Sequence, residues 1–310
     1  MAFVLLDSLT LPGDAAKPNE DFFAHAPHAA LVMDGATMLG GNLMPGPSDA
    51  AWIAQFGSRR LMAHLADGAP PRAALKKALG DAQKSFAALQ RHPPEAKWQI
   101  PCASMMLVTE IVPRDAQRRA GEMAVAGSRA SESQRGQENL SEGRRGLDFM
   151  WLGDCAALLG QGGRVEVIGH VLPARSAEAA RARTVTKDMP AAIDLNRPQI
   201  LEHLRAGRAR VGSGDYWLFA PDPAIAPHAA RRRAKARSGD HLLLASDGFL
   251  ALISDYGAYD ADGLLAGALD KGLAALGAEL RAIEQADAKG ERFPRFKASD
   301  DATALLLKLE

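Results

Sequence analysis

A short apolar run that ends at a carboxylate decides how this chain folds: ALVMDG at residues 30–35. Apolar residues followed by an Asp-Gly pair are typical of a buried strand that stops at a turn. The same pattern returns as HLLLASDG at residues 241–248 and as FMWLGD at residues 149–154. A last apolar run at residues 303–309 follows Asp300 and Asp301. Four predicted strands therefore begin or end at a carboxylate.

The remaining elements are predicted from the spacing of apolar residues. Short apolar runs bounded by Gly, Pro, Asp or Ser predict further strands at residues 3–6, 105–108, 156–159 and 165–168. Helical spacing predicts helices over residues 48–67 and 75–89, and one long helix over residues 265–283. Because the helices are grouped rather than alternating with strands, the pattern predicts an α+β fold with mainly antiparallel sheets covered by helices.

One domain is predicted for residues 1–310, with two irregular segments inside it. The segment at about residues 114–146 is rich in Arg, Ser, Glu, Gln and Gly, which indicates a polar insertion between two strands. The segment at about residues 170–240 contains several prolines and two basic clusters, and we expect a flap-like surface region there. No internal repeat is visible.

Composition excludes several classes of protein. The charges of the 37 basic and 37 acidic residues cancel, which disfavours a general nucleic-acid binder. The basic run at residues 231–237 is therefore expected to be a solvated loop face or a docking surface for an acidic phosphoprotein. No apolar run approaches the roughly 20 residues of a membrane span. The first residues lack the basic region of a secretory signal, which predicts a cytoplasmic protein. Cys102 and Cys155 have neither disulfide nor zinc-site spacing.

The carboxylates at the strand ends are the candidate functional residues. Each of Asp34, Asp154 and Asp247 has an ordinary explanation as a turn residue beside a glycine. Taken together, carboxylates at the ends of several strands would supply the oxygen ligands that Mg²⁺ and Mn²⁺ prefer, from a rigid frame. Glu20 and Asp21 add two more acids near the N-terminus. The pattern therefore favours a divalent-cation site.

In their order, these motifs resemble those of the metal-dependent (PPM, type 2C) Ser/Thr protein phosphatases of the bacterial type. The matching pieces are KPNED at residues 17–21, LVMDG at 31–35, LGDC at 152–155, LASDG at 244–248 and DDAT at 300–303. The resemblance extends from about residue 17 to residue 309. It implies a sandwich of two mostly antiparallel β-sheets flanked by helices, with the metal site at one edge.

The resemblance also implies a ligand set and a reaction. It implies two Mn²⁺ or Mg²⁺ ions and a third, more weakly bound ion. Asp34 would bridge the first two ions, the carbonyl of Gly35 would bind one of them, and Asp247 and Asp300 would bind the other. Glu20 and Asp21 would act through bound waters, and Asp154 would help Asp247 to hold the third ion. A bridging hydroxide would attack the phosphorus of phosphoserine or phosphothreonine esters, without a covalent intermediate. The implied substrate is a phosphorylated protein, opposite a Ser/Thr kinase.

Two positions depart from the family pattern. Ala16 stands where relatives commonly carry a phosphate-gripping Arg, and the neighbouring Lys17 is the predicted substitute, which gives Asp34, Asp247 and Lys17 as the catalytic set. Ala36 stands where eukaryotic members often carry a His that could serve as a general acid. These departures leave open an alternative, in which the chain is a degenerate pseudo-phosphatase that binds phosphoproteins or regulates a partner.

Two further alternatives concern single residues. The run from Val32 to Thr37 also resembles the start of a haloacid-dehalogenase motif, but Val32 occupies the position of the nucleophilic Asp, so that chemistry has no mechanism here. Cys155 follows Asp154 directly, and it is either an oxidation-sensitive thiol at the site or a buried, inert one.

Overall fold

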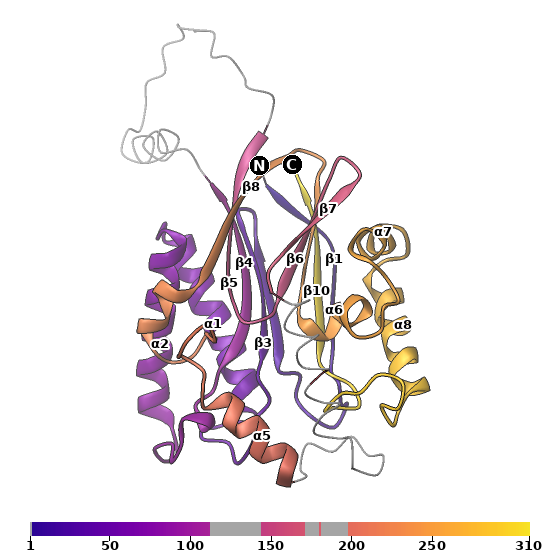
Figure 1. Cartoon of the computed structure of the whole chain (residues 1–310). Helices are drawn as coiled ribbons and strands as arrows, with labels where there is room; N and C mark the ends of the chain where they lie inside the picture. The colour runs from indigo at the N-terminus through magenta and orange to yellow at the C-terminus, as the bar shows by residue number, and fades with distance from the viewer. Residues whose placement is uncertain (1, 112–143, 171–179, 181–197) are drawn as a thin grey trace, which may run out of the picture.

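Two β-sheets lie face to face between two layers of helices (Figure 1). The computed structural model describes residues 2–111, 144–170, 180 and 198–310. The first sheet has the strand order β1 (Phe3–Leu11), β10 (Ala302–Leu309), β9 (His241–Ala245), β6 (Ala156–Gln161) and β7 (Arg164–Ile168). The second has the order β2 (Asp21–Ala26), β3 (Ala29–Gly35), β4 (Ala103–Ile111), β5 (Arg144–Leu152) and β8 (Ala230–Arg237). The predicted α+β sandwich of antiparallel sheets is confirmed.

All the strand pairs are antiparallel, and the first strand pairs with the last. Phe3 lies opposite Leu309, and hydrogen bonds also join Ala2 to Glu310 in both directions. The two ends of the chain therefore meet at one end of the sandwich (Figure 1).

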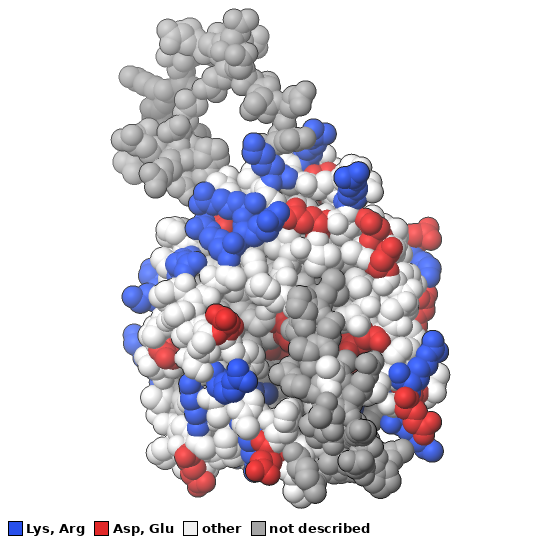
Figure 2. Space-filling view, in the orientation of Figure 1, with Lys and Arg blue, Asp and Glu red and all other residues white. Residues whose placement is uncertain are grey.

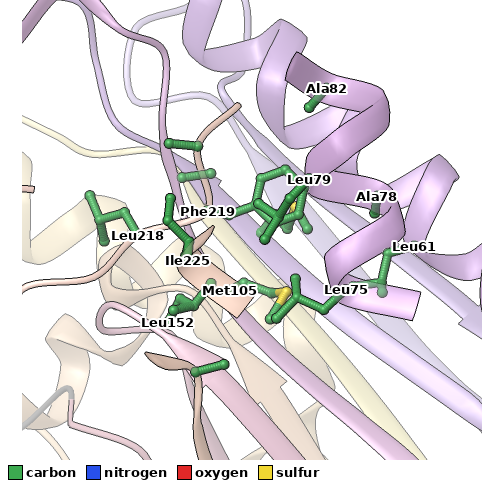
Figure 3. Close-up of a cluster of buried hydrophobic side chains, with 14 of the residues drawn as sticks. Leu61, Leu75, Ala78, Leu79, Ala82, Met105, Leu152, Leu218, Phe219 and Ile225 are labelled. Atoms are coloured by element: carbon green, nitrogen blue, oxygen red, sulfur yellow. The ribbon is translucent and has the colours of Figure 1, made fainter. Parts of the chain in front are cut away.

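Side chains of the central strands alternate between two cores. In β3, Val32 packs against the other sheet, whereas Leu31 and Met33 pack against the helices that cover the second sheet. Figure 3 shows part of this helix-side core, where Leu75 and Leu79 of a helix meet Met105 of β4 and other apolar side chains. Burial on both faces explains why the β3 run in the sequence is apolar without interruption.

Helices cover the outer face of each sheet. The second sheet is covered by α1 (Asp49–Ala66) and α2 (Pro71–Leu89), and the first by α6 (Asp247–Ser254), α7 (Ala261–Lys271) and α8 (Leu273–Ala286). The other helical elements are η1 (Lys97–Gln99), α5 (Pro198–Arg208) and η2 (Pro223–His228). Ser48 caps α1 by accepting the Ala51 N–H, and Pro71 occupies the first turn of α2, where its missing N–H costs nothing.

The prediction of one long helix over residues 265–283 is wrong. The apolar spacing continues through the segment, but Gly272 has φ +82° and ψ 161° and separates α7 from α8. This backbone conformation is open to glycine and strained for other residues. Asp7 of β1 accepts the N–H of Leu273 at 2.8 Å, which stabilises the start of α8.

The basic run at residues 231–237, for which the sequence predicts a solvated loop face or a docking surface, lies in β8, the edge strand of the second sheet. Its alternate residues Ala234 and Ala236 face the core between the sheets, while Arg233 and Lys235 are exposed. Figure 2 shows basic side chains gathered near the upper part of β8. Charged side chains on an edge strand discourage pairing with other chains.

Neither β2 nor α6 is among the elements that the sequence predicts. β2 has only Asp21 fully buried among its residues, and α6 begins at an Asp-Gly pair that otherwise indicates a turn. Most of the polar insertion predicted at about residues 114–146 lies outside the described residues, as does much of the flap predicted at about residues 170–240. The described part of that flap contains α5, η2 and β8.

In the part of the chain that the structure describes, no helix has both the length and the apolar character that a bilayer crossing requires.

Candidate functional site

Three carboxylates converge where strands from both sheets end. Asp34 is the penultimate residue of β3, and Asp154 lies in the turn after β5. Asp247 is the first residue of α6, and one residue separates it from the end of β9. One carboxylate oxygen from each lies within 4.8 Å of the others. Residues separated by more than two hundred positions in the sequence are therefore brought together by the packing of the two sheets.

The turn that carries Asp154 is fixed by glycine and by a hydrogen bond. Gly153 has φ +75°, and a Cβ atom added there would lie 2.3 Å from the hydroxyl oxygen of Ser104. Only glycine fits this turn without displacement. The Ser104 hydroxyl donates to Oδ1 of Asp154 at 2.5 Å, which orients the carboxylate.

Asp21 and Asp34 lie opposite each other on neighbouring strands. Oδ2 of Asp21 accepts a hydrogen bond from the Ser246 hydroxyl at 2.8 Å. Oδ1 of Asp21 is buried and has no hydrogen-bond partner within the described residues. An unpaired buried carboxylate oxygen is costly, and a proton, a cation or a water that a bound cation holds would relieve that cost. This observation fits the predicted divalent cation.

Two hydroxyl groups hold Glu20. Thr37 donates to its Oε2 and Ser48 donates to its Oε1, each at 2.5 Å. The peptide N–H of Glu20 donates to Oδ2 of Asp301 at 2.6 Å, and the Glu20 carbonyl accepts the N–H of Gly35. The Glu20 carboxylate is thus fixed next to the strand end that carries Asp34.

Asp300 and the neighbouring Asp301 make different contacts. Asp301 accepts the peptide N–H groups of Gly13 and Glu20, so it ties the N-terminal segment to the start of β10. Asp300 instead forms an ion pair with Lys297, at 2.6 Å between Oδ1 and Nζ. Asp300 and Lys297 both line the cavity described next.

A cavity of about 830 Å³ contains the carboxylates. The acidic wall includes Asp34, Asp154, Asp247 and Asp300, with Gly35 beside them. Aromatic residues line another part of it, including Trp217, whose ring stacks on that of His228 with centroids 3.4 Å apart. A volume of this size accepts a phosphorylated side chain.

The electrostatics of the cluster favour a bound cation. Burial raises the pKa of Asp34 well above its usual range, and the charges of Asp247 and Asp21 raise it further. Burial likewise raises the pKa of Asp21, against the lowering effect of the hydrogen bond from Ser246. Like charges crowded in this way repel one another unless protons or metal ions neutralise them. The donor set, carboxylates only, suits Mg²⁺ or Mn²⁺.

Lys17 is not placed with this cluster. Its side chain is 71% exposed, and its amine lies 3.6 Å from Asp14. Lys17 is absent from the described residues that line the cavity. Its role as the phosphate ligand therefore stays a prediction.

The structure adds cavity residues that sequence reasoning missed. Lys297 and Thr37 line the cavity, and Arg208 of α5 lines it as well. Arg208 donates to the carbonyl oxygen of Ala36 and so holds the segment after Asp34. The only signal for Lys297 in the sequence was its position three residues before Asp300.

Cys155 is fully buried, and burial raises the pKa of its thiol well above the usual range, with the charges of Asp34 and Asp154 adding to the effect. A protonated, inaccessible thiol is a weak nucleophile. The inert one of the two expectations for Cys155 is therefore the one that the geometry supports.

Replacing Asp21 with Asn tests the electrostatics. Folding raises the pKa of Asp21 above its ordinary value of 3.8, so the folded state binds more protons than the unfolded state and stability falls as pH rises above that value. With metal chelated, the Asn variant is expected to be more stable than wild type at pH 7.5, and this advantage should shrink toward pH 4. Urea unfolding at both pH values measures it, and an advantage that grows toward pH 4 would contradict the argument.

The architecture matches solved phosphatases. The crystal structure of the serine/threonine phosphatase PstP/Ppp of Mycobacterium tuberculosis superposes with a TM-score of 0.53 at 16% sequence identity, over 100% of each chain. A variant of a bacterial serine phosphatase gives a TM-score of 0.50 at 13% identity, over 99% of this chain and 98% of the other. Neither protein-family models nor curated proteins give a match to the sequence. At such low identity, the likeness shows a shared fold, which the resemblance of the motifs had predicted.

Proposed function

We propose that this chain is an Mn²⁺- or Mg²⁺-dependent phosphatase that hydrolyses phosphoserine or phosphothreonine esters. The observation that carries the proposal is the convergence of Asp34, Asp154 and Asp247 within 4.8 Å, inside a cavity large enough for a phosphorylated side chain. The fold shared with bacterial Ser/Thr phosphatases supports the same reaction class.

The chain's own residues provide the frame of the reaction. Asp34 and Asp247 would hold the ions from two different sheets, and Asp154 would share one of them. Glu20 and Asp21 stand behind Asp34 and would accept hydrogen bonds from waters around the ions. Rigid strand ends keep these groups in place, so little reorganisation accompanies the reaction.

Bound divalent cations would supply an activated water near neutral pH and offset the charge of the phosphoryl group. The chain would add the exclusion of bulk solvent from the cavity and the orientation of the ester within it. The proposed substrate is a phosphorylated protein that a Ser/Thr kinase supplies, since the ester must be formed before it can be hydrolysed.

Hydrolysis of an aryl phosphate and of a phosphothreonine peptide tests the proposal, with Mn²⁺, with Mg²⁺ and with chelator. We expect turnover that requires metal and that the Asp247→Asn variant loses. Asp270→Asn is the matched control, because Asp270 is an exposed residue of α7 away from the cavity, and it should behave as wild type. Calorimetric metal binding without any turnover would contradict the proposal and favour the phosphoprotein-binding alternative. Turnover that chelator does not affect would overturn the metal requirement.

A further inference from the structure

Lys297 lines the cavity, and its ammonium group donates hydrogen bonds to two side chains. Nζ donates to Oδ1 of Asp300 at 2.6 Å and to Oγ1 of Thr37 at 2.9 Å. The Thr37 hydroxyl has one proton, which it donates to Glu20, so its lone pairs face Lys297. The ammonium is therefore seated between a carboxylate and an oriented hydroxyl.

In the part of the chain that the structure describes, the ammonium group of Lys297 has one N–H donor more than the acceptors that hold it. An ammonium group carries three N–H donors, and within the described residues two of them have acceptors. The third is left for an acceptor in the cavity that Lys297 lines.

The segment that carries Lys297 is firmly held. The guanidinium of Arg295 donates to the carboxylate of Asp287 at 2.9 Å and to the carbonyl oxygens of Glu284 and Ala298, at 3.2 and 3.1 Å. The side chain of Arg295 is only 12% exposed. A cation that is already positioned loses little entropy when it binds an anion.

We propose that Lys297 is the phosphate-binding cation of this site, donating its third N–H to a phosphoryl oxygen of the substrate while Asp300 and Thr37 hold its other two. This inference rests on the proposed function and names a residue that takes over the task of the missing Arg at position 16. It differs from the prediction for Lys17, whose amine is exposed and pairs with Asp14. The ligand class is a phosphate monoester dianion.

The position of Lys297 also makes Asp300 different from the other carboxylates. Asp34, Asp154 and Asp247 form the tight cluster, whereas Asp300 already has a cation at 2.6 Å. A charge-assisted hydrogen bond of this kind is short and strong, so Asp300 positions the ammonium of Lys297. The role of Asp300 as a ligand of a metal ion, which the family resemblance implies, stays a prediction.

Binding of inorganic phosphate to the Mn²⁺-loaded protein tests this inference, measured by calorimetry and separately from turnover. Lys297→Met removes the charge and keeps the length of the side chain, and it is expected to weaken phosphate binding about tenfold or more, which is the usual range for a charge-assisted hydrogen bond. Lys297→Arg restores a cation and should recover part of the affinity. Lys289→Met is the matched control at an exposed lysine and should bind phosphate as wild type does.

The outcomes separate this inference from the proposed function. If Lys297→Met binds phosphate as wild type does while Mn²⁺ binding and turnover persist, the inference is overturned and the proposed function stands. A loss confined to Lys17→Met would likewise overturn it and return the task to Lys17. If Lys297→Met only tightens Mn²⁺ binding, the lysine is a counter-ion of Asp300 and no phosphate ligand. Wild-type protein that binds neither Mn²⁺ nor phosphate would overturn both.

Discussion

Asn in place of Asp34 is expected to lower kcat/KM by at least about a hundredfold, because even residues that only support metal ligands typically cost ten- to a hundredfold. Asp34 is the carboxylate with neighbours on every side: Asp21 opposite it on β2, Ser104 opposite it on β4, and Asp154 and Asp247 in the cluster. The amide keeps the shape of the side chain and removes its charge. Calorimetry should show the accompanying loss of Mn²⁺ affinity.

The Asp34→Asn substitution should not destabilise the fold. Burial and the charges of Asp247 and Asp21 raise the pKa of Asp34, so the ionised carboxylate destabilises the metal-free protein at neutral pH. In chelator at pH 7.5, Asp34→Asn is therefore expected to melt at the same temperature as wild type or higher. A melting temperature well below that of wild type would show that Asp34 is a structural residue. Near-normal turnover with Mn²⁺ would show that Asp34 is not part of the active site. Asp270→Asn again serves as the control for the chemical change.

Adding a single methyl group at Gly248 is expected to produce the largest loss of stability. A Cβ atom there would lie 2.0 Å from the carbonyl oxygen of Asp301 and 3.3 Å from Cβ of Asp300. The nearest atom is backbone, so no rotamer change relieves the clash, and overpacking of this kind costs about 1–3 kcal/mol or more. Because α6 must then move away from the start of β10, Asp247 and Asp300 should separate.

Gly248→Ala should therefore lower both the midpoint of urea unfolding and the affinity for Mn²⁺. Gly80→Ala is the matched control, because Gly80 lies inside α2 and an added Cβ would meet no atom within 4 Å beyond the backbone of its own helix and its two chain neighbours. Alanine is also the better helix former, by about 0.5–1 kcal/mol. We expect the control to be slightly more stable than wild type. A Gly248→Ala protein as stable as wild type would mean that the contact between α6 and β10 is looser than the structure has it.

The acidic cluster could be predicted because its members share a local pattern. Asp34, Asp154 and Asp247 each come at the end of an apolar run and next to a glycine, and the packing of two sheets brings such ends together. The sequence therefore predicts that these three carboxylates lie close together, as they do in the structure. Their role as metal ligands stays a prediction. Lys297 could not be found in this way. Its contact with Thr37 joins positions 260 residues apart, and no local pattern records such a contact.

Strand β8 was missed because its sequence has little apolar signal. Strand β8 reads as a basic run because, apart from its first residue Ala230, only Ala234 and Ala236 face the core and its other residues are charged. Pairing with β5 forms this strand, and Arg231 adds a hydrogen bond to Asp148 across the pair. The break between α7 and α8 was missed because the helical spacing of leucines continues on both sides of Gly272. The break lies only in the backbone conformation of Gly272.

The pairing of the first strand with the last also determines when the site can form during synthesis. β10 lies between β1 and β9, so β1 has no neighbour in its sheet until the final residues of β10 have left the ribosome. Contacts of such long sequence separation form slowly and leave strand edges open meanwhile. Asp300 arrives together with β10, so a nascent chain that stops short of residue 300 lacks both the strand that joins β1 to β9 and the partner of Lys297. In this protein, pairing of β1 with its only neighbour and completion of the proposed phosphate site at Lys297 are therefore the same event.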